Sequence, residues 1–199
     1  MELKEILKQH LQEASSILND FSSNEAYLQS VEDAALIIIQ SLQSGKKIIS
    51  AGNGGSMCDA MHFAEELSGK WRNDRKPLPA ISISDPSHIT CVANDYGFAY
   101  VFSRYLKAIG NPGDVFFGIT TSGNSENIIR ASMEAKSKEM KVVILTSDNS
   151  GDLQEHFSDC VDIFIMTPKN KHADRIQELH IKIIHSLIDI IEKKLGLQS

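Results

Sequence analysis

The sequence predicts an α/β protein built on a doubly wound, five-stranded parallel sheet flanked by helices. Two observations indicate this fold: short β-prone runs recur along the chain, and most of the segments between them are long enough for crossover helices. The predicted strands cover residues 48–51, 80–83, 115–120, 142–146 and 161–165. Because neighbouring parallel strands need such long connections, the alternation favours one parallel sheet.

Helices are predicted before and after the sheet. Apolar residues recur at helical spacing over residues 3–21 and again over 28–42, within an N-terminal extension of residues 1–45. Gly45 is the expected end of the second helix. A final helix is predicted over residues 174–195, and its apolar residues spread beyond one stripe. We therefore expect another subunit to cover part of that helix.

Composition limits the class of protein. The chain has 199 residues, 42% hydrophobic and 23% charged, which fits one soluble globular domain. The net charge of −6 argues against nucleic-acid binding, and there is no membrane-spanning run. Three cysteines without close pairs, and a start unlike a signal peptide, predict reduced thiols in a cytoplasmic protein.

The segment 48–66 carries the clearest chemical signal. A strand runs into a glycine-rich turn at residues 52–56 and then into a helix with His62 and Glu66. Backbone N–H groups at such a helix start favour an anion such as phosphate. One helical turn separates His62 from Glu66, so both can serve a metal or a proton-transfer site. Alternatively, His62 and Glu66 are a solvated pair on the surface of the helix. Glu65 is expected to be a surface or interface charge.

A second polar loop, residues 121–125, follows the predicted strand 115–120 and precedes a helix over 126–138. Open α/β sheets bind ligands at the carboxyl ends of their strands, so both loops could face one ligand. Neither loop has a dinucleotide fingerprint or a P-loop, which favours a small phosphorylated ligand. Ordinary turns with serine caps remain an alternative. A third polar turn at residues 94–97 could bind hydroxyl groups or be a structural Asx turn.

Two polar residues interrupt the apolar final helix. Gln177 and His185 lie two turns apart, and burying them requires polar partners or a metal. His180 is expected to be a core histidine, with a supporting catalytic role as the minority alternative.

Four motifs carry a resemblance to a known family: Ser-Ala-Gly-Asn-Gly-Gly-Ser at 50–56, Asp-Ala-Met-His-Phe-Ala-Glu-Glu-Leu at 59–67, Thr-Ser-Gly-Asn-Ser at 121–125 and Ala-Asp-Arg-Ile-Gln-Glu-Leu-His-Ile-Lys at 173–182. They resemble the phosphoheptose isomerases over nearly the whole chain. The resemblance implies a single sugar-isomerase (SIS) domain over 1–199. It also implies interconversion of D-sedoheptulose 7-phosphate and D-glycero-D-manno-heptose 7-phosphate, the first step toward bacterial lipopolysaccharide or capsule heptose.

The resemblance also implies roles for individual residues. One zinc ion per subunit would be bound by His62, Glu66, Gln177 and His185, with Glu66 as the base and His185 as its acid partner. The implied substrate contacts are Asn53, Gly54, Gly55, Ser56, Glu66, Asn94, Asp95, Thr120, Thr121, Ser122, Ser125 and Gln177.

The family resemblance implies a homotetramer whose active sites could be shared, so that Gln177 and His185 could meet His62 and Glu66 of a neighbouring chain. One alternative function is a non-catalytic SIS-fold regulator that binds the replication initiator. Another is an isomerase for a different ketose phosphate. Retention of all four expected ligands favours the heptose isomerase, because a scaffold has no need of them.

Overall fold

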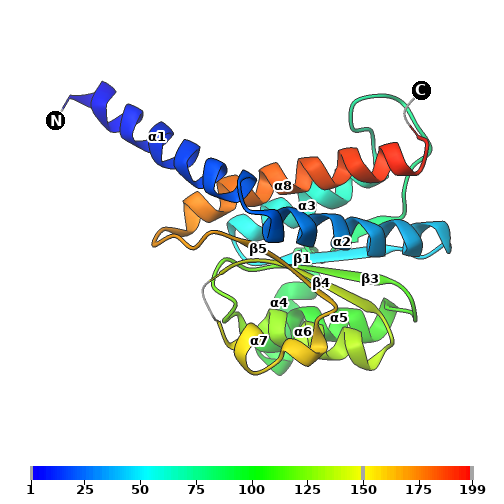
Figure 1. The fold of residues 1–199 in the computed structure, drawn as a ribbon. Coiled ribbons are helices and arrows are strands. Elements are labelled where there is room, and N and C mark those ends of the chain that lie inside the picture. The colour runs from blue at the N-terminus through cyan, green and yellow to red at the C-terminus, as the bar shows by residue number, and fades with distance from the viewer. Residues whose placement is uncertain (1, 149–150, 198–199) are drawn as a thin grey trace.

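A computed structural model describes residues 2–148 and 151–197 of the chain. Its centre is a five-stranded parallel sheet in the order β2-β1-β3-β4-β5 (Figure 1). The strands are β1 (Ile48–Gly52), β2 (Ala80–Ser82), β3 (Val115–Ile119), β4 (Lys141–Ser147) and β5 (Ile163–Thr167). The predicted fold class is therefore confirmed.

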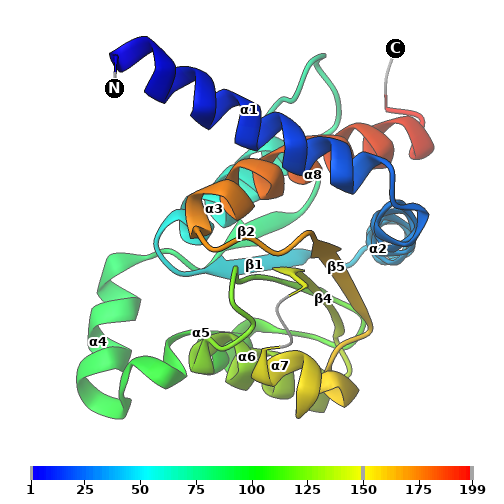
Figure 2. The ribbon, with the colours of Figure 1, turned by 60° about the vertical axis from the view of Figure 1, so that its left-hand side comes forward.

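Helices cover both faces of the sheet (Figures 1 and 2). One face carries α1 (Leu3–Ser22), α2 (Glu25–Gln43), α3 (Gly55–Ser68) and α8 (Ala173–Lys194). The other carries α4 (Pro86–Tyr96), α5 (Val101–Ile109), α6 (Glu126–Ser137) and α7 (Asp152–Glu155), with short 3-10 helices at Phe98–Tyr100 and Ser158–Cys160. Gly45 follows α2 with φ +71°, as expected for a residue that ends a helix.

The central strands are mostly apolar because both faces of the sheet are covered. Every residue of β1 and β3 is buried. Side chains alternate between two cores, since Ile48 and Phe117 pack under α3 and α8 while Ile49 and Phe116 pack against α5 and α6. Burial on both sides explains why the strands read as apolar runs in the sequence.

The last strand begins two residues later than the sequence predicts. The predicted strand starts at residue 161, whereas β5 starts at Ile163. The N–H of Val161 donates to the carbonyl of Ser158 at 2.9 Å, which closes a 3-10 turn instead of extending the sheet. Local hydrogen bonding thus outweighs the β-propensity of valine here.

The sheet has a topological switch point between its first and third strands. From β1 the chain passes to β2 on one side, and then returns to place β3 on the other side of β1. The carboxyl ends of these strands lie side by side, with Gly52 in register with Ile119. Open α/β sheets bind ligands at such a crevice.

Helix α8 is largely covered within its own chain, because α1, α2 and α3 all pack against it. The second subunit expected from its broad apolar surface is therefore not needed to bury most of it. Helix α1 projects from the body (Figure 1), with Leu3, Leu7 and Leu11 exposed near its free end. No helix within residues 2–148 and 151–197 is long and apolar enough to cross a lipid bilayer.

Candidate active site

The turn between β1 and α3 is shaped by close backbone approach. A Cβ on Gly52 would lie 2.4 Å from the carbonyl oxygen of Ser56, and one on Gly55 would lie 2.7 Å from the side-chain amide of Gln177. Gly54 has φ +54°, a conformation that favours glycine. It is also the N-cap of α3 and has no side chain to cap the helix. This leaves an uncapped helix start suited to a polar ligand.

Asn53 is held by a residue that the sequence analysis did not identify. Its side chain and that of Asn127 exchange two hydrogen bonds, of 2.9 and 2.8 Å. Asn127 is 3% exposed and lies in the first turn of α6. The pair therefore ties the turn after β1 to the helix that follows the second polar loop.

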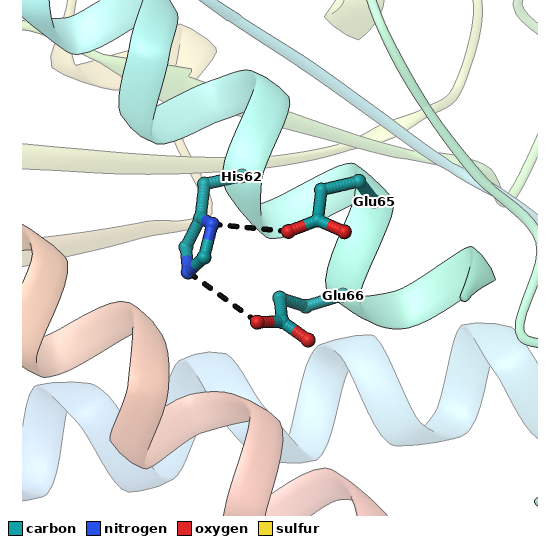
Figure 3. Close-up of side chains that lie close together, drawn as sticks. All are labelled: His62, Glu65 and Glu66. Carbon is teal, nitrogen blue, oxygen red and sulfur yellow. Dashed lines mark ion pairs between the residues drawn. The ribbon is translucent and has the colours of Figure 1, made fainter. Parts of the chain in front are cut away.

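His62 lies between two carboxylates of its own helix (Figure 3). Its Nδ1 is 3.1 Å from Glu65 Oε1, and its Nε2 is 3.6 Å from Glu66 Oε1. Glu65 has the exposed side chain expected of a surface charge, but it also contacts His62. The i, i+3 spacing in the sequence was the available signal for this contact.

The structure brings His185 to His62 within one chain. Their Nε2 atoms are 3.0 Å apart, and the ring of Trp71 lies 4.9 Å from the ring of His185. Helices α3 and α8 run side by side in the same direction, because Gly55 meets Gln177 at one end and His62 meets His185 further along. No neighbouring subunit is needed to form the histidine pair.

The pKa shifts of Glu66 and His185 suit proton transfer. Burial lowers the pKa of His185, and the charges of His62, Lys182 and Arg72 lower it further. Burial also raises the pKa of Glu66, as does the negative charge of Glu65, while His62 and Arg75 oppose this shift. The cavity therefore holds an imidazole that favours its neutral form and a carboxylate that is more basic than usual.

These groups line an open cavity of about 600 Å³, together with residues outside the predicted set. Its lining residues are Cys58, Asp59, His62, Glu66, Trp71, Ile181 and His185. Asp59 was missed in the sequence, although it shares a face of α3 with His62 and Glu66 at spacings of three and seven residues. Burial raises its pKa to about 6, and its Oδ2 is buried without a hydrogen-bond partner among the described residues.

The donor atoms fit a zinc ion. Zinc bonds to histidine nitrogen are about 2.0–2.1 Å long, so ligand atoms of a tetrahedral site lie roughly 3.3 Å apart. The two Nε2 atoms are 3.0 Å apart, and Glu66 Oε1 is 3.6 Å from one of them. Glu65 at His62 Nδ1 matches the carboxylate that often orients a metal-bound histidine.

Gln177 lies apart from this cluster and outside the residues that line the cavity. Its amide lies against Gly55, at the start of α3. His62 follows Gly55 by seven residues, or about 10 Å of helix. The structure thus joins three of the four expected ligands through their donor atoms and places the fourth beside the glycine-rich turn.

The second polar loop follows β3, at the same edge of the sheet. Thr120 Oγ1 and Ser125 Oγ are 3.1 Å apart, so the Ser125 hydroxyl does not cap α6. Ser122 Oγ accepts a hydrogen bond from the N–H of Asn124, and the carbonyl of Thr121 accepts one from Ser147. The start of α6 is therefore uncapped and follows a loop rich in hydroxyl groups, an arrangement suited to phosphate.

Asn94 and Asp95 lie elsewhere. They belong to the last turn of α4, followed by Gly97 with φ +97°, so the alternative of an Asx turn at this position is wrong. Asn94 Nδ2 donates to Asp95 Oδ1 at 2.9 Å, and both residues are exposed. In this single chain α4 lies on the face of the sheet opposite α3 and α8 (Figure 2).

The chain is similar to known proteins over almost all of its length. Residues 9–147 match the SIS domain. The phosphoheptose isomerase of Cytophaga hutchinsonii is 57% identical over 185 residues, covering 93% of this chain and 95% of that one. The phosphoheptose isomerase of Tolumonas auensis is 53% identical over 193 residues, covering 97% and 98%.

Solved structures give the same result. The phosphoheptose isomerase of Neisseria gonorrhoeae superposes with a TM-score of 0.87 at 36% identity, covering 96% of this chain and all of that one. The enzyme of Francisella tularensis gives 0.89 at 34% identity, covering 97% and 100%. The chain therefore belongs to the SIS-domain family and, within it, to the phosphoheptose isomerases.

Proposed function

We propose that this protein interconverts D-sedoheptulose 7-phosphate and D-glycero-D-manno-heptose 7-phosphate. The observation that carries the proposal is the meeting of His62, Glu66 and His185 in one cavity. A carboxylate and an imidazole are sufficient for an aldose–ketose isomerisation, in which a proton moves between C1 and C2 through an enediol. The identity to named phosphoheptose isomerases supports this choice of sugar.

Substrate binding is assigned to the two loops at the switch point. Thr120, Thr121, Ser122 and Ser125 are proposed to bind the phosphate, which is supported by the uncapped start of α6 and by the Thr120 and Ser125 hydroxyl groups, 3.1 Å apart, in the loop before it. The turn of Asn53, Gly54, Gly55 and Ser56, with the amide of Gln177 beside it, would then contact the sugar near its reacting end. Asn94 and Asp95 are proposed to bind sugar hydroxyls, and their exposure on α4 fits a contact made in an assembled oligomer.

Proton transfer is assigned to two residues. Glu66 removes a proton from C1 of the ketose and returns it to C2, and its raised pKa makes it a better base near neutral pH. His185 donates a proton to the oxygen at C2 and accepts the one leaving the oxygen at C1, so that the net change is a shift of the carbonyl. The neutral imidazole favoured by burial can serve in both directions.

A zinc ion, one per subunit, is proposed to be held by His62, Glu66 and His185. Gln177, the further ligand of this proposal, has its amide against Gly55 and would have to move toward the cluster to bind the ion. When bound, the ion supplies Lewis-acid stabilisation of the negative charge that develops on the substrate oxygens. A protein stripped by chelator and still fully active would contradict this assignment.

The assembly and location are part of the same proposal. Residues 1–199 would act as one SIS unit, with the extension 1–45 used for self-association into a homotetramer. The exposed leucines on the projecting end of α1 support this use. All three cysteines are free thiols, in keeping with the reducing cytoplasm that we propose as the location. The product would enter heptose synthesis for lipopolysaccharide or capsule.

The test is turnover by the purified protein with a panel of ketose phosphates. Zinc-loaded protein is incubated with sedoheptulose 7-phosphate, ribulose 5-phosphate or fructose 6-phosphate, and aldose formation is followed by NMR. We expect turnover of the seven-carbon substrate at a rate at least tenfold above the others. Preference for a shorter ketose would overturn the substrate assignment. The absence of turnover with all three would favour the regulatory alternative.

A further inference from the structure

Arg75 forms a buried connection between the two helices of the active site. It lies in the segment between α3 and β2, and its side chain is 2% exposed. Arg75 Nε donates to Oε1 of Glu192 on α8 at 2.7 Å, and the Glu192 side chain is 1% exposed. The two charges therefore neutralise each other inside the protein.

The other donors of Arg75 bind the carboxyl end of α3. Nη2 donates to the carbonyl of Glu66 at 2.7 Å, and Nη1 donates to the carbonyls of Leu67 and Gly69 at 2.7 and 3.1 Å. The last carbonyls of a helix lack partners within the helix and carry partial negative charge. The guanidinium thus pairs with the end of α3 and with α8 at the same time.

Arg75 and Glu192 are connected to the two helices that carry the proposed acid/base groups. One carbonyl bound by Arg75 belongs to Glu66 itself. Glu192 follows His185 by seven residues, which is about two turns along the same face of α8. Trp71 lies in the same connecting segment as Arg75, and its ring packs beside that of His185. Movement of Arg75 would therefore displace Glu66, His185 and Trp71, which all line the cavity.

We propose that Arg75 and Glu192 are positioning residues for the isomerisation: through directional hydrogen bonds they fix Glu66 on α3 against His185 on α8. This inference rests on the proposed isomerase function. A buried ion pair is an inefficient way to gain stability, because apolar residues of similar volume often stabilise a protein as well or better. What apolar side chains cannot supply is the fixed direction of the guanidinium's bonds.

The experiment separates the effect of the directional hydrogen bonds of Arg75 from the effect of burying two side chains at this place. Arg75→Lys keeps the charge but removes the planar fork, whereas the double variant Arg75→Met with Glu192→Leu replaces the pair by apolar side chains. Arg130→Lys is the matched control, because Arg130 forms an exposed ion pair with Glu126 on α6. Each protein is assayed with sedoheptulose 7-phosphate well below its own melting temperature, with far-UV circular dichroism to confirm folding.

We expect kcat to fall about 10- to 100-fold in Arg75→Lys and in the double variant, because displacements of about 1 Å cost this much in catalysis. KM should change less than about threefold, since the phosphate loop is untouched. The control should keep the parent kcat. A folded double variant with the parent kcat would overturn the proposal, and so would a loss that follows only the fraction of unfolded protein.

A second readout is independent of turnover. Trp71 is the chain's single tryptophan and contacts His185, so its emission reports the cavity. We expect Zn²⁺ alone to change the Trp71 emission in the parent and in Arg130→Lys, and to give a smaller change at higher Zn²⁺ in both Arg75 variants. Identical titrations in all four proteins would contradict positioning by Arg75. If the parent shows no turnover, the proposed function fails while this titration still tests the inference.

Discussion

The two ends of α3 pack against the same helix, α8, by opposite means. At its start, Gly55 permits contact by having no side chain, and the Gln177 amide occupies that space. At its end, Arg75 makes the contact by donating hydrogen bonds to the backbone carbonyl of Glu66 and to the carboxylate of Glu192. The difference indicates a division of labour in which the start of α3 is shaped for substrate and the end is fixed for proton transfer.

The largest effect on stability is expected from protonation of His180, which lies on α8, the helix that both ends of α3 contact. His180 lies on α8 between Gln177 and His185, is 0% exposed, and has its pKa lowered by burial to about 3. An interaction with the backbone of Thr146 opposes this shift without cancelling it. The unfolded chain binds this proton near pH 6.5, so stability should be full above pH 6.5 and fall as pH drops toward 3.

The expected slope is up to about 1.4 kcal/mol per pH unit. Urea unfolding at a series of pH values measures it, and His180→Gln should remove this part of the slope. The same substitution at the exposed His156 should leave it unchanged. Equal slopes in the parent and His180→Gln would show that His180 is not held neutral.

A smaller effect is expected from filling the space at Gly55. In Gly55→Ala the new methyl group would overlap the Gln177 amide, and we expect a cost of about 1 kcal/mol, at the low end for overpacking, because the amide ends a flexible side chain that can shift. Gln177→Ala removes the obstacle, so Gly55→Ala made in that background should be neutral or stabilising. Thermal unfolding of the four proteins in this double-mutant cycle measures the coupling. Additive effects would show that the two residues do not meet.

Breaking the Asn53–Asn127 pair should affect substrate binding, the role assigned to the start of α3, and not proton transfer, the role assigned to its end. Asn127→Ala leaves the Asn53 amide without its two bonds, which should cost about 1–2 kcal/mol of stability. Because the pair joins the two loops assigned to substrate, we expect KM to rise about tenfold with little change in kcat. Steady-state kinetics provides the measurement. A fall in kcat at constant KM would remove the proposed division of labour.

The sequence predicted the parts of the molecule that local patterns determine. The runs that became β1 and β3 are apolar because both faces of each strand are buried, and His62 with Glu66 was found from its one-turn spacing. Arg75 was missed because it lies in a segment rich in charged residues that reads as a solvated loop. Its burial depends on Glu192, more than a hundred residues later, and local spacing carries no signal of that contact.

An effect on metal affinity alone is expected from the orientation of His62. Glu65→Gln weakens the contact to His62 Nδ1 without removing any of the three donor atoms in the cavity. Loss of such an orienting carboxylate typically lowers metal affinity about 10-fold or more. Zinc titration against a competing chelator measures this affinity, with Glu25→Gln, at the exposed start of α2, as the control. Unchanged affinity in Glu65→Gln would limit Glu65 to a surface role.

Glu66 is proposed to carry the proton in a site shared with His62 and His185. The most direct measurement compares the parent and Glu66→Gln in deuterated water, at zinc concentrations that saturate both proteins, by NMR of sedoheptulose 7-phosphate. In the parent we expect deuterium to enter C1 of the unreacted ketose while aldose is formed. In Glu66→Gln both rates should fall at least about 100-fold. Exchange at C1 within twofold of the parent rate would contradict the claim.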